Sequence, residues 1–256
     1  MAQKSEVTLA VDRIESTVQK EIKKLGFRKH GRTLCRFTGP EADIAQIINF
    51  QTGMSWREET HLLKVNVAIR VPECQERNFV DPLEKKKYYQ EYDANIRSSL
   101  GEIDGEEYCR QFNLKEENLE VIEHEILDDI LNKVIPVFDI LNSRENILLH
   151  RKKYPHFDKL NQNLILLEEA MMYGRLGNLE KAKQCFEAYY QKAVDKYEYL
   201  TKYGEKEKIT KGTTIEYMGR IYTYDDADDE GYVTVYGTSH GHIDYLDELA
   251  VKNGLR

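Results

Sequence analysis

The chain has 256 residues, of which 41% are hydrophobic and 32% are charged, a composition typical of a globular protein with one large domain or two small ones. Its net charge of −8 argues against a general nucleic-acid binder, because such proteins use Lys and Arg to displace phosphate counterions. No apolar run is long enough to cross a membrane, and the N-terminus lacks the apolar segment of a signal peptide. We therefore expect a cytoplasmic protein that binds neither nucleic acid nor membrane.

The cysteines are widely spaced and form no CxxC pair; they are Cys35, Cys74, Cys109 and Cys185. This spacing fits buried thiols in a reducing cytoplasm better than disulfides. The chain has no GxSxG, no Walker loop and no GxGxxG after a predicted strand, and we expect no cofactor. The absence of these motifs disfavours the common enzyme classes without excluding catalysis.

Residues 5–25 are predicted to form an amphipathic helix. Its apolar residues recur at spacings of three and four: Val7, Val11, Ile14, Val18, Ile22 and Leu25. Gly26 should end the helix, because glycine readily adopts the positive φ of a C-terminal cap.

Three strands are predicted next, at about 27–38, 43–51 and 61–71. The third has the clearest alternation: Leu63, Val65, Val67, Ile69 and Val71 point one way, and Lys64, Asn66, Ala68 and Arg70 the other. This pattern indicates an antiparallel sheet with one buried face and one wetter face. Residues 96–101 are a candidate fourth strand.

A short helix is predicted near Leu83–Tyr92, and a long helix over about Leu114–Leu141, which Pro136 should kink or end early. Residues 143–158 contain few apolar residues and are predicted to link two halves. The second half should contain two helices around residues 160–193, a β-hairpin at Thr213–Tyr224 and Tyr232–Gly237, and a helix at His242–Asn253. The predicted organisation is thus an α+β domain at 1–142, a linker at 143–158 and an αα-hairpin with a small β-hairpin at 159–256.

Four short motifs resemble the domain of unknown function 4304 family, which is mostly bacterial. They are Leu25-Gly26-Phe27, Asn49-Phe50-Gln51, Val65-Asn66-Val67 and Ile96-Arg97, in that order. The resemblance covers roughly residues 1–140 and implies a helix, a sheet and a long helix. It implies no activity. The last motif often carries a second Arg, whereas this chain has Ser98 and Ser99 at those places.

Residues 160–200 look like a single tetratricopeptide-type helix pair, with Ala170, Tyr173, Leu176-Gly177-Asn178, Ala182 and Phe186 at the spacing of that motif. Glu169 departs from it, since the motif has an apolar residue there. Such repeats need about three copies to form a stable stack, and one unit also fits a plain αα-hairpin.

The candidate binding residues are polar positions of the predicted sheet, which could share one face if the strands pair in order. They are Arg32, Arg36, Asn49, Gln51, Lys64, Asn66 and Arg97. Amides and guanidinium groups form directional hydrogen bonds without acid–base chemistry, which suits recognition better than catalysis. The alternative is that a helix or the second half covers this face.

Two segments of the second half carry weaker indications of metal binding. The acidic stretch Asp225–Gly231 superficially resembles a calcium loop, but Gly237 stands where a bidentate Glu is required, so a hairpin tip is favoured. His240 and His242 lack an evident third ligand. No metal site is predicted.

The leading hypothesis is a non-enzymatic bacterial protein of the cytoplasm that binds another protein, in an immunity-type or regulatory role. The alternative is an enzyme or binding protein for an anionic, phosphorylated small molecule, with Arg32, Arg36 and Arg97 as anion clamps. A homodimer that uses the exposed sheet or the helix pair is a third hypothesis.

Overall fold

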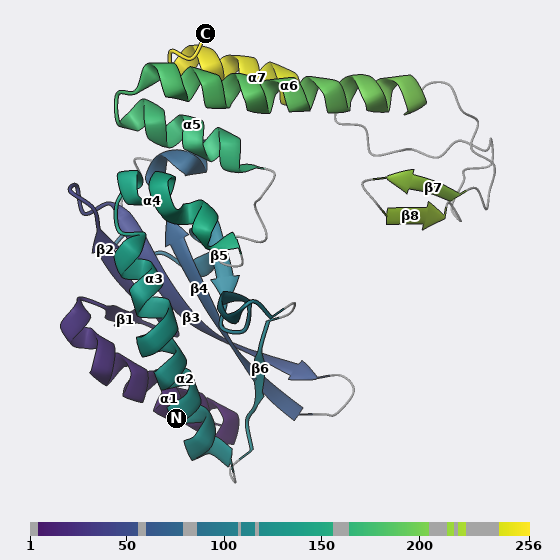
Figure 1. Ribbon diagram of the computed structural model, residues 1–256. Coiled ribbons are helices and arrows are strands. Elements are labelled where there is room, and N and C mark those ends of the chain that lie inside the picture. The colour runs from purple at the N-terminus through teal and green to yellow at the C-terminus, as the bar shows by residue number, and fades with distance from the viewer. Residues whose placement is uncertain are drawn as a thin grey trace. The chain divides into compact units, whose positions relative to one another are not determined.

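The computed structural model describes residues 5–55, 60–78, 86–106, 109–115, 118–155, 164–204, 214–217, 220–223 and 241–256 (Figure 1). The chain divides into two compact units, Met1–Leu176 and Gly177–Arg256, and each is described by itself. The first unit has the predicted α+β architecture.

The first unit is built on a six-stranded antiparallel sheet, counted over the described residues. Its strands are β1 (Arg28–His30), β2 (Thr33–Thr38), β3 (Ile44–Ser55), β4 (Thr60–Arg70), β5 (Ile96–Ser99) and β6 (Gln111–Asn113). The order is β1-β2-β3-β4-β5, and β6 pairs with β4 next to β5. The predicted antiparallel sheet is confirmed, and it is larger than the three or four strands expected.

The first predicted strand is in fact a hairpin. Residues 27–38 fold into β1 and β2 around a two-residue turn at Gly31 and Arg32, with His30 paired to Thr33. Gly31 has φ +60°, which glycine adopts without the clash that a Cβ would cause. The short strand β6 was not predicted at all.

The N-terminal helix is confirmed as α1 (Glu6–Ile22), which continues as a 3₁₀ turn at Lys23–Leu25. Ser5 caps it by accepting a hydrogen bond from the Thr8 N–H. Gly26 ends the turn with φ +91°, as the sequence predicts.

The predicted long helix is also present, but Pro136 does not end it. Helix α2 (Leu119–Asp129) runs through a π-helical turn at Ile130–Val134 into α3 (Ile135–Ile140). A π turn changes the hydrogen-bond spacing just before Pro136, whose ring nitrogen has no proton to donate. The helix therefore passes the proline and ends near Leu141.

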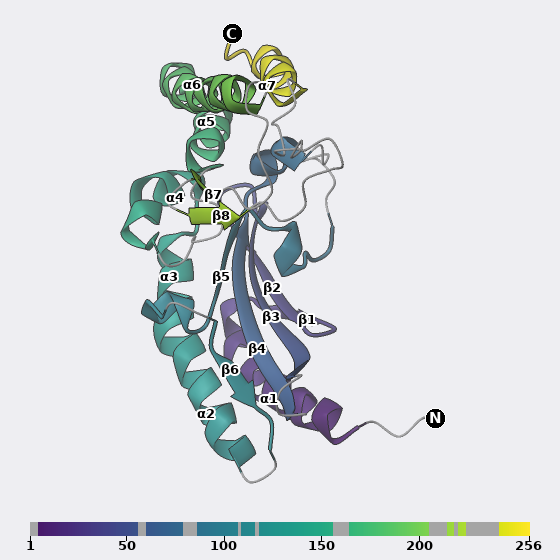
Figure 2. The ribbon, with the colours of Figure 1, turned by 90° about the vertical axis from the view of Figure 1, so that its right-hand side faces the viewer.

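One face of the sheet packs against α1, α2 and α3 and is called the helix-covered face (Figure 2). The strand register brings six apolar side chains together on this face, and each is at most 1% exposed: Leu34, Ile48, Phe50, Val65, Val67 and Ile69. Phe27 after α1 stacks on Phe138 of α3, with 6.2 Å between ring centroids. This face is the main hydrophobic core.

The other face is called the opposite face. Residues 86–95 cover the half of it that contains Cys35, Ile47 and Ala68, which is called its upper half. Cys35, Ile47 and Ala68 form a small buried cluster there with Tyr89 and Ala94. In this segment the structure places a 3₁₀ turn, η3 (Glu91–Asp93), and no helix over 86–90; the rest of the helix predicted at 83–92 lies outside the described residues.

The predicted linker at 143–158 contains structure that belongs to the first unit. Helix α4 (Arg144–His150) lies in it, and α5 (Ile165–Arg175) follows. Arg144 is 4% exposed and binds two carboxylates: its Nε and Nη2 donate to Glu73 at 2.6 and 2.9 Å, and its Nη1 and Nη2 donate to Asp43 at 3.1 and 2.7 Å. This ion cluster fixes α4 to the residues that flank β3 and β4, and the two compact units divide after Leu176.

The second unit contains α6 (Leu179–Gly204), β7 (Thr214–Tyr217), β8 (Arg220–Thr223) and α7 (Gly241–Lys252). The C-terminal Arg256 lies 3.7 Å above the ring of Tyr190 of α6 and pairs with Glu187. Strands β7 and β8 pair with each other inside the first strand predicted at 213–224, while residues 232–237, the acidic stretch and His240 lie outside the described residues. No helix within the described part of the chain is both long and apolar enough to cross a membrane.

We predict that Arg144→Met destabilises the protein by about 3–5 kcal/mol at neutral pH, because it leaves the carboxylates of the buried Glu73 and the half-buried Asp43 without this partner. Burial alone would raise the pKa of Asp43, but the hydrogen bonds and charge of Arg144 outweigh it and lower that pKa. A lowered pKa stabilises the fold above the ordinary aspartate value, and this contribution is lost as the pH falls through the folded-state value. The difference in unfolding free energy between the unchanged protein and the variant should therefore become smaller in acid.

Denaturant unfolding of both proteins across acid and neutral pH measures this difference. The control is Lys24→Met, which removes an exposed pair with Glu21 and should cost less than about 1 kcal/mol. Equal losses in the two variants would contradict a stabilising role for the buried cluster.

A second prediction concerns Cys35, which lies beneath Tyr89. Burial raises the pKa of the Cys35 thiol to about 11, although a hydrogen bond with the Tyr89 backbone lowers it. Iodoacetamide should therefore modify Cys35 about a hundredfold more slowly than the half-buried Cys109 at mildly alkaline pH. Tyr89→Ala should speed this reaction, and Tyr92→Ala should not, because Tyr92 is 67% exposed. Mass spectrometry of the labelled peptides gives both rates.

Candidate functional site

A row of polar side chains crosses four strands on the lower half of the opposite face. Thr33, Asn49, Asn66 and Ser99 are direct cross-strand neighbours on β2, β3, β4 and β5. In antiparallel pairs such neighbours point to the same side of the sheet. The strand register alone therefore brings these four side chains into one line.

Hydrogen bonds within this row connect the sheet to the segment that covers the upper half of the face. The Asn49 amide Nδ2 donates to the Thr33 hydroxyl at 2.9 Å and approaches Gln90 Oε1 at 3.5 Å. The Thr33 hydroxyl donates to the same Gln90 oxygen at 2.6 Å. Asn49 thus lies where the covered half of the face ends.

A second polar row lies further along the strands and consists of Gln51, Lys64 and Gln111, again direct neighbours. The buried Asn66 donates from Nδ2 to Gln51 Oε1 at 3.0 Å, which links the two rows. Gln51 and Gln111 are exposed and Lys64 is half-buried. These two rows, from Thr33 to Gln111, are called the polar rows.

The chemistry of the polar rows is hydrogen bonding and charge. They contain amides, hydroxyls and one ammonium group, and the Ser99 hydroxyl donates to the neighbouring Glu102 carboxylate at 2.7 Å. Asn66 donates to the Gln51 carbonyl, and among the described residues no hydrogen bond engages the NH2 group of the exposed Gln51. Such groups select a partner by direction and charge rather than by reacting with it.

Arg97 is on the same face but one row away, in register with Ala68. Its Nη2 lies 3.7 Å from the carboxylate of Glu91, and its side chain is 36% exposed. It borders the polar rows with its charge partly neutralised.

Arg36 does not belong to this site, contrary to the sequence prediction. It pairs with Gln46 across β2 and β3 on the helix-covered face. Its Nε donates to Gln46 Oε1 at 2.6 Å, its Nη1 to the Leu25 carbonyl at 3.2 Å and its Nη2 to Asp139 at 2.5 Å. Arg36 therefore connects the sheet to α3.

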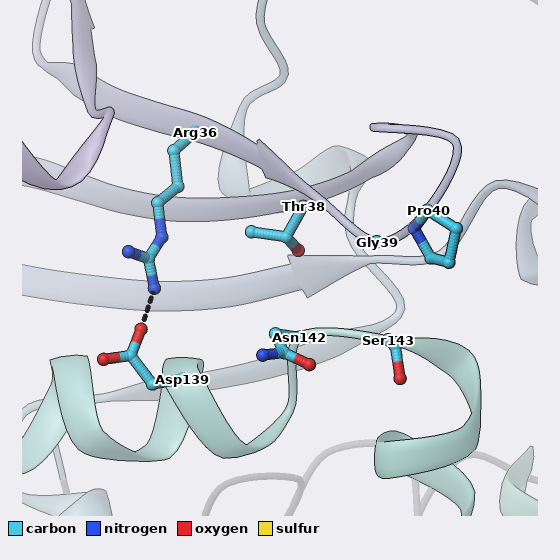
Figure 3. A pocket seen from close by; sticks show the side chains of 7 residues that line it. All are labelled: Arg36, Thr38, Gly39, Pro40, Asp139, Asn142 and Ser143. Atoms are coloured by element: carbon cyan, nitrogen blue, oxygen red, sulfur yellow. Dashed lines mark hydrogen bonds and ion pairs between the residues drawn. The ribbon is translucent and has the colours of Figure 1, made fainter.

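Arg36 also lines an open pocket of about 450 Å³ at the junction of β2 with the end of α3 (Figure 3). Its guanidinium group points toward Asp139 there, and the remaining lining residues are Thr38, Gly39, Pro40, Asn142 and Ser143. This pocket is on the other side of the sheet from the polar rows.

Arg32 is also misplaced by the prediction, since it sits in the β1–β2 turn. Its Nη1 donates to the Thr52 hydroxyl at 3.5 Å, and its Nε lies 4.0 Å from the buried carboxylate of Glu15 in α1. Thr52 is on the helix-covered side of β3 because it pairs with Leu63. The three arginines proposed as anion clamps thus lie in three separate places, each near a carboxylate.

Four of the seven predicted residues therefore meet in the polar rows: Asn49, Gln51, Lys64 and Asn66. Sequence reasoning omitted Thr33, Ser99, Gln90 and Gln111 from the site. The alternation of β2 already put Thr33 on the face away from Leu34, but the register was needed to place it beside Asn49. Nothing in the sequence indicates the position of Gln90, which comes from irregular chain. Over the described ranges, no group of three His, Cys, Asp or Glu side chains could hold a metal ion.

Comparison with known proteins supports a family likeness for the first unit only. Residues 18–140 match the model of the family described as "Domain of unknown function (DUF4304)". Comparisons with curated proteins and with solved structures found no match. The likeness of residues 160–200 to a tetratricopeptide unit stays a prediction. Over residues 18–140 the chain resembles DUF4304, as its short motifs predict, and the Asn and Gln residues of those motifs lie in the polar rows.

Proposed function

We propose that this chain is a non-enzymatic bacterial protein of the cytoplasm that binds another protein through the polar rows, in an immunity-type or regulatory role. The observation that carries the proposal is the set of connected amides around Lys64 on the lower half of the opposite face. The partner surface should be acidic and rich in hydrogen-bonding groups.

The charge of the sheet supports an acidic partner. Strands β1 to β6 contain no Asp or Glu, and their positions on the opposite face carry Arg28, Lys64, Arg70 and Arg97. Arg70 is buried against the Tyr89 ring, with 4.0 Å from its guanidinium carbon to the ring centroid, whereas Arg28 is exposed. The strand positions of this face thus carry only positive charge in a chain of net charge −8, with Glu91 beside Arg97 and Glu102 beside Ser99, and an excess of cations steers an acidic partner toward it.

Site-specific photo-crosslinking tests the proposal. A benzophenone amino acid in place of Gln51 should capture an acidic protein from native lysate, and the same group in place of Leu149, exposed on α4, should not. Lys64→Glu should lower the Gln51 crosslink about tenfold, because like charges meet at the interface. The matched control is Lys23→Glu, an exposed position outside the polar rows that gives the same net charge. If the Lys64→Glu and Lys23→Glu variants crosslink the partner equally well, in low and in high salt, the proposal is refuted.

The second candidate function is binding of an anionic, phosphorylated small molecule. The sheet face does not supply converging arginines for it, but Arg36 lines the open pocket together with the Thr38 and Ser143 hydroxyls and the Asn142 amide. In this arrangement an anion would compete with Asp139 for the guanidinium group.

Asp139→Asn tests this second candidate, because it removes the competing carboxylate while keeping the shape of the side chain. Inorganic phosphate, nucleotides and sugar phosphates should raise the melting temperature of the variant more than that of the unchanged protein. Asp195→Asn, on α6, serves as a control for the lost charge. If none of these anions changes either melting temperature, the pocket is not an anion site.

A further inference from the structure

Strand β3 continues past the end of its neighbour β2, which leaves part of one strand edge open. Strand β2 pairs with residues 44–49 of β3, whereas β4 pairs with residues 45–55. Figure 1 shows β3 and β4 running on together beyond β1 and β2. Within the described chain, no strand lies beside residues 51–55 on the β2 side.

The hydrogen bonds of β3 show which backbone groups face this open edge. The N–H of Phe50 donates to the Arg32 carbonyl at 2.9 Å, so Phe50 faces the β2 side. Successive residues of an antiparallel strand direct their backbone groups alternately to the two neighbours. The N–H and C=O groups of Thr52 and Met54 therefore point to the open edge, and those of Gln51 and Gly53 point to β4.

The side chains around this edge leave room for another strand. Gln51, Thr52 and Gly53 are all exposed. A Cβ added at Gly53, on the opposite face, would meet no atom within 4 Å, so that face is also open beside the edge. Unpaired N–H and C=O groups on a strand of this length are a template for an extended peptide, because main-chain hydrogen bonds supply affinity in such complexes.

Charge indicates what kind of strand fits. Arg32 lies beside Thr52 at the point where β2 stops, and Lys64 stands opposite Gln51 on the next strand. Lys64 lies one strand in from the edge on the opposite face, and Arg32 lies on the helix-covered side, 4.0 Å from Glu15. A second copy of this chain would add its own Arg32 and Lys64 to this region, which like-charge repulsion disfavours. An acidic segment would meet them with opposite charge.

We propose that residues 51–55 of β3 accept an extended acidic segment of the partner protein as an added strand. Its backbone pairs with Thr52 and Met54, and its carboxylates approach Arg32 and Lys64. This inference rests on the proposed protein-binding function and specifies how the partner is held.

The test uses the full chain, labelled with ¹⁵N, and a blocked heptapeptide of alternating Glu with Thr or Val. At a peptide concentration about ten times its Kd, hydrogen exchange at the Thr52 and Met54 amides should slow about tenfold, because exchange then proceeds from the free protein. The same peptide with Lys in place of Glu should bind much more weakly. Absence of binding at millimolar Glu peptide, or equal binding of the Lys peptide, would overturn the inference.

A proline substitution separates the edge from the face. Thr52→Pro removes the outward N–H without removing a β3–β4 hydrogen bond. It should weaken binding of the Glu peptide about tenfold. Thr52→Ala keeps the N–H and should change binding less than about twofold. Equal affinities of these two variants for the Glu peptide would overturn strand addition. The same conclusion would follow if, without peptide, the Thr52 and Met54 amides became protected from exchange as the protein concentration rises.

Lys64→Glu distinguishes failure of this inference from failure of the proposed function. If the peptide shifts amides around Lys64 and leaves Thr52 and Met54 unchanged, strand addition is wrong and the acid-binding face stands. If the partner crosslinked at Gln51 binds Lys64→Glu as well as the unchanged protein, the proposed function is wrong, whatever the peptide does at Thr52.

Discussion

The register between β3 and β4 is the constraint on which the rest of the first unit depends. The two strands pair over eleven positions, from Ala45 with Arg70 to Ser55 with Thr60. A slip of one residue would turn Val65 and Val67 toward solvent and bring Lys64 and Asn66 under the helices. Each large apolar side chain that lost its burial would cost about 1.5–3 kcal/mol. The hydrophobic face therefore selects the register, and the register alone then lines up the polar rows.

Polar residues on the helix-covered face have a different role, which explains why Arg36 does not lie in the predicted site. Gln46 donates from Nε2 to the Phe138 carbonyl at 2.5 Å and accepts from Arg36. The last carbonyls of a helix have no partner within the helix, so Gln46 satisfies a group that would otherwise be buried unpaired. Arg36 and Gln46 thus close the junction between the sheet and α3, in the middle of an otherwise apolar layer.

How much could be predicted depends on the range of the interaction concerned. Period-3.6 and period-2 patterns correctly located α1, β4 and α2, because local burial alone produces them. The same alternation separated Lys64 and Asn66 from Val65 within one strand. It could not decide whether Arg36 shares a face with Asn49, because that depends on the length of the turn between β2 and β3. Residues 86–95 cover the sheet, and Arg144 attaches α4 to Asp43 and Glu73, through contacts between distant segments. A sequence pattern does not encode such contacts.

The polar rows are costly in terms of folding, and this bears on their purpose. Asn66 is 6% exposed, and a buried amide destabilises the fold unless it is hydrogen-bonded, whereas Val or Ile at the same place would not. Its bond to Gln51 removes that penalty and also fixes the exposed amide in one orientation. Groups held in place before binding lose less conformational entropy when a partner arrives. Because β3 carries both Gln51 and the open edge at Thr52, side-chain and backbone donors are fixed by one strand. The pairing that satisfies the buried amide thus also orients the surface that we propose binds an acidic segment.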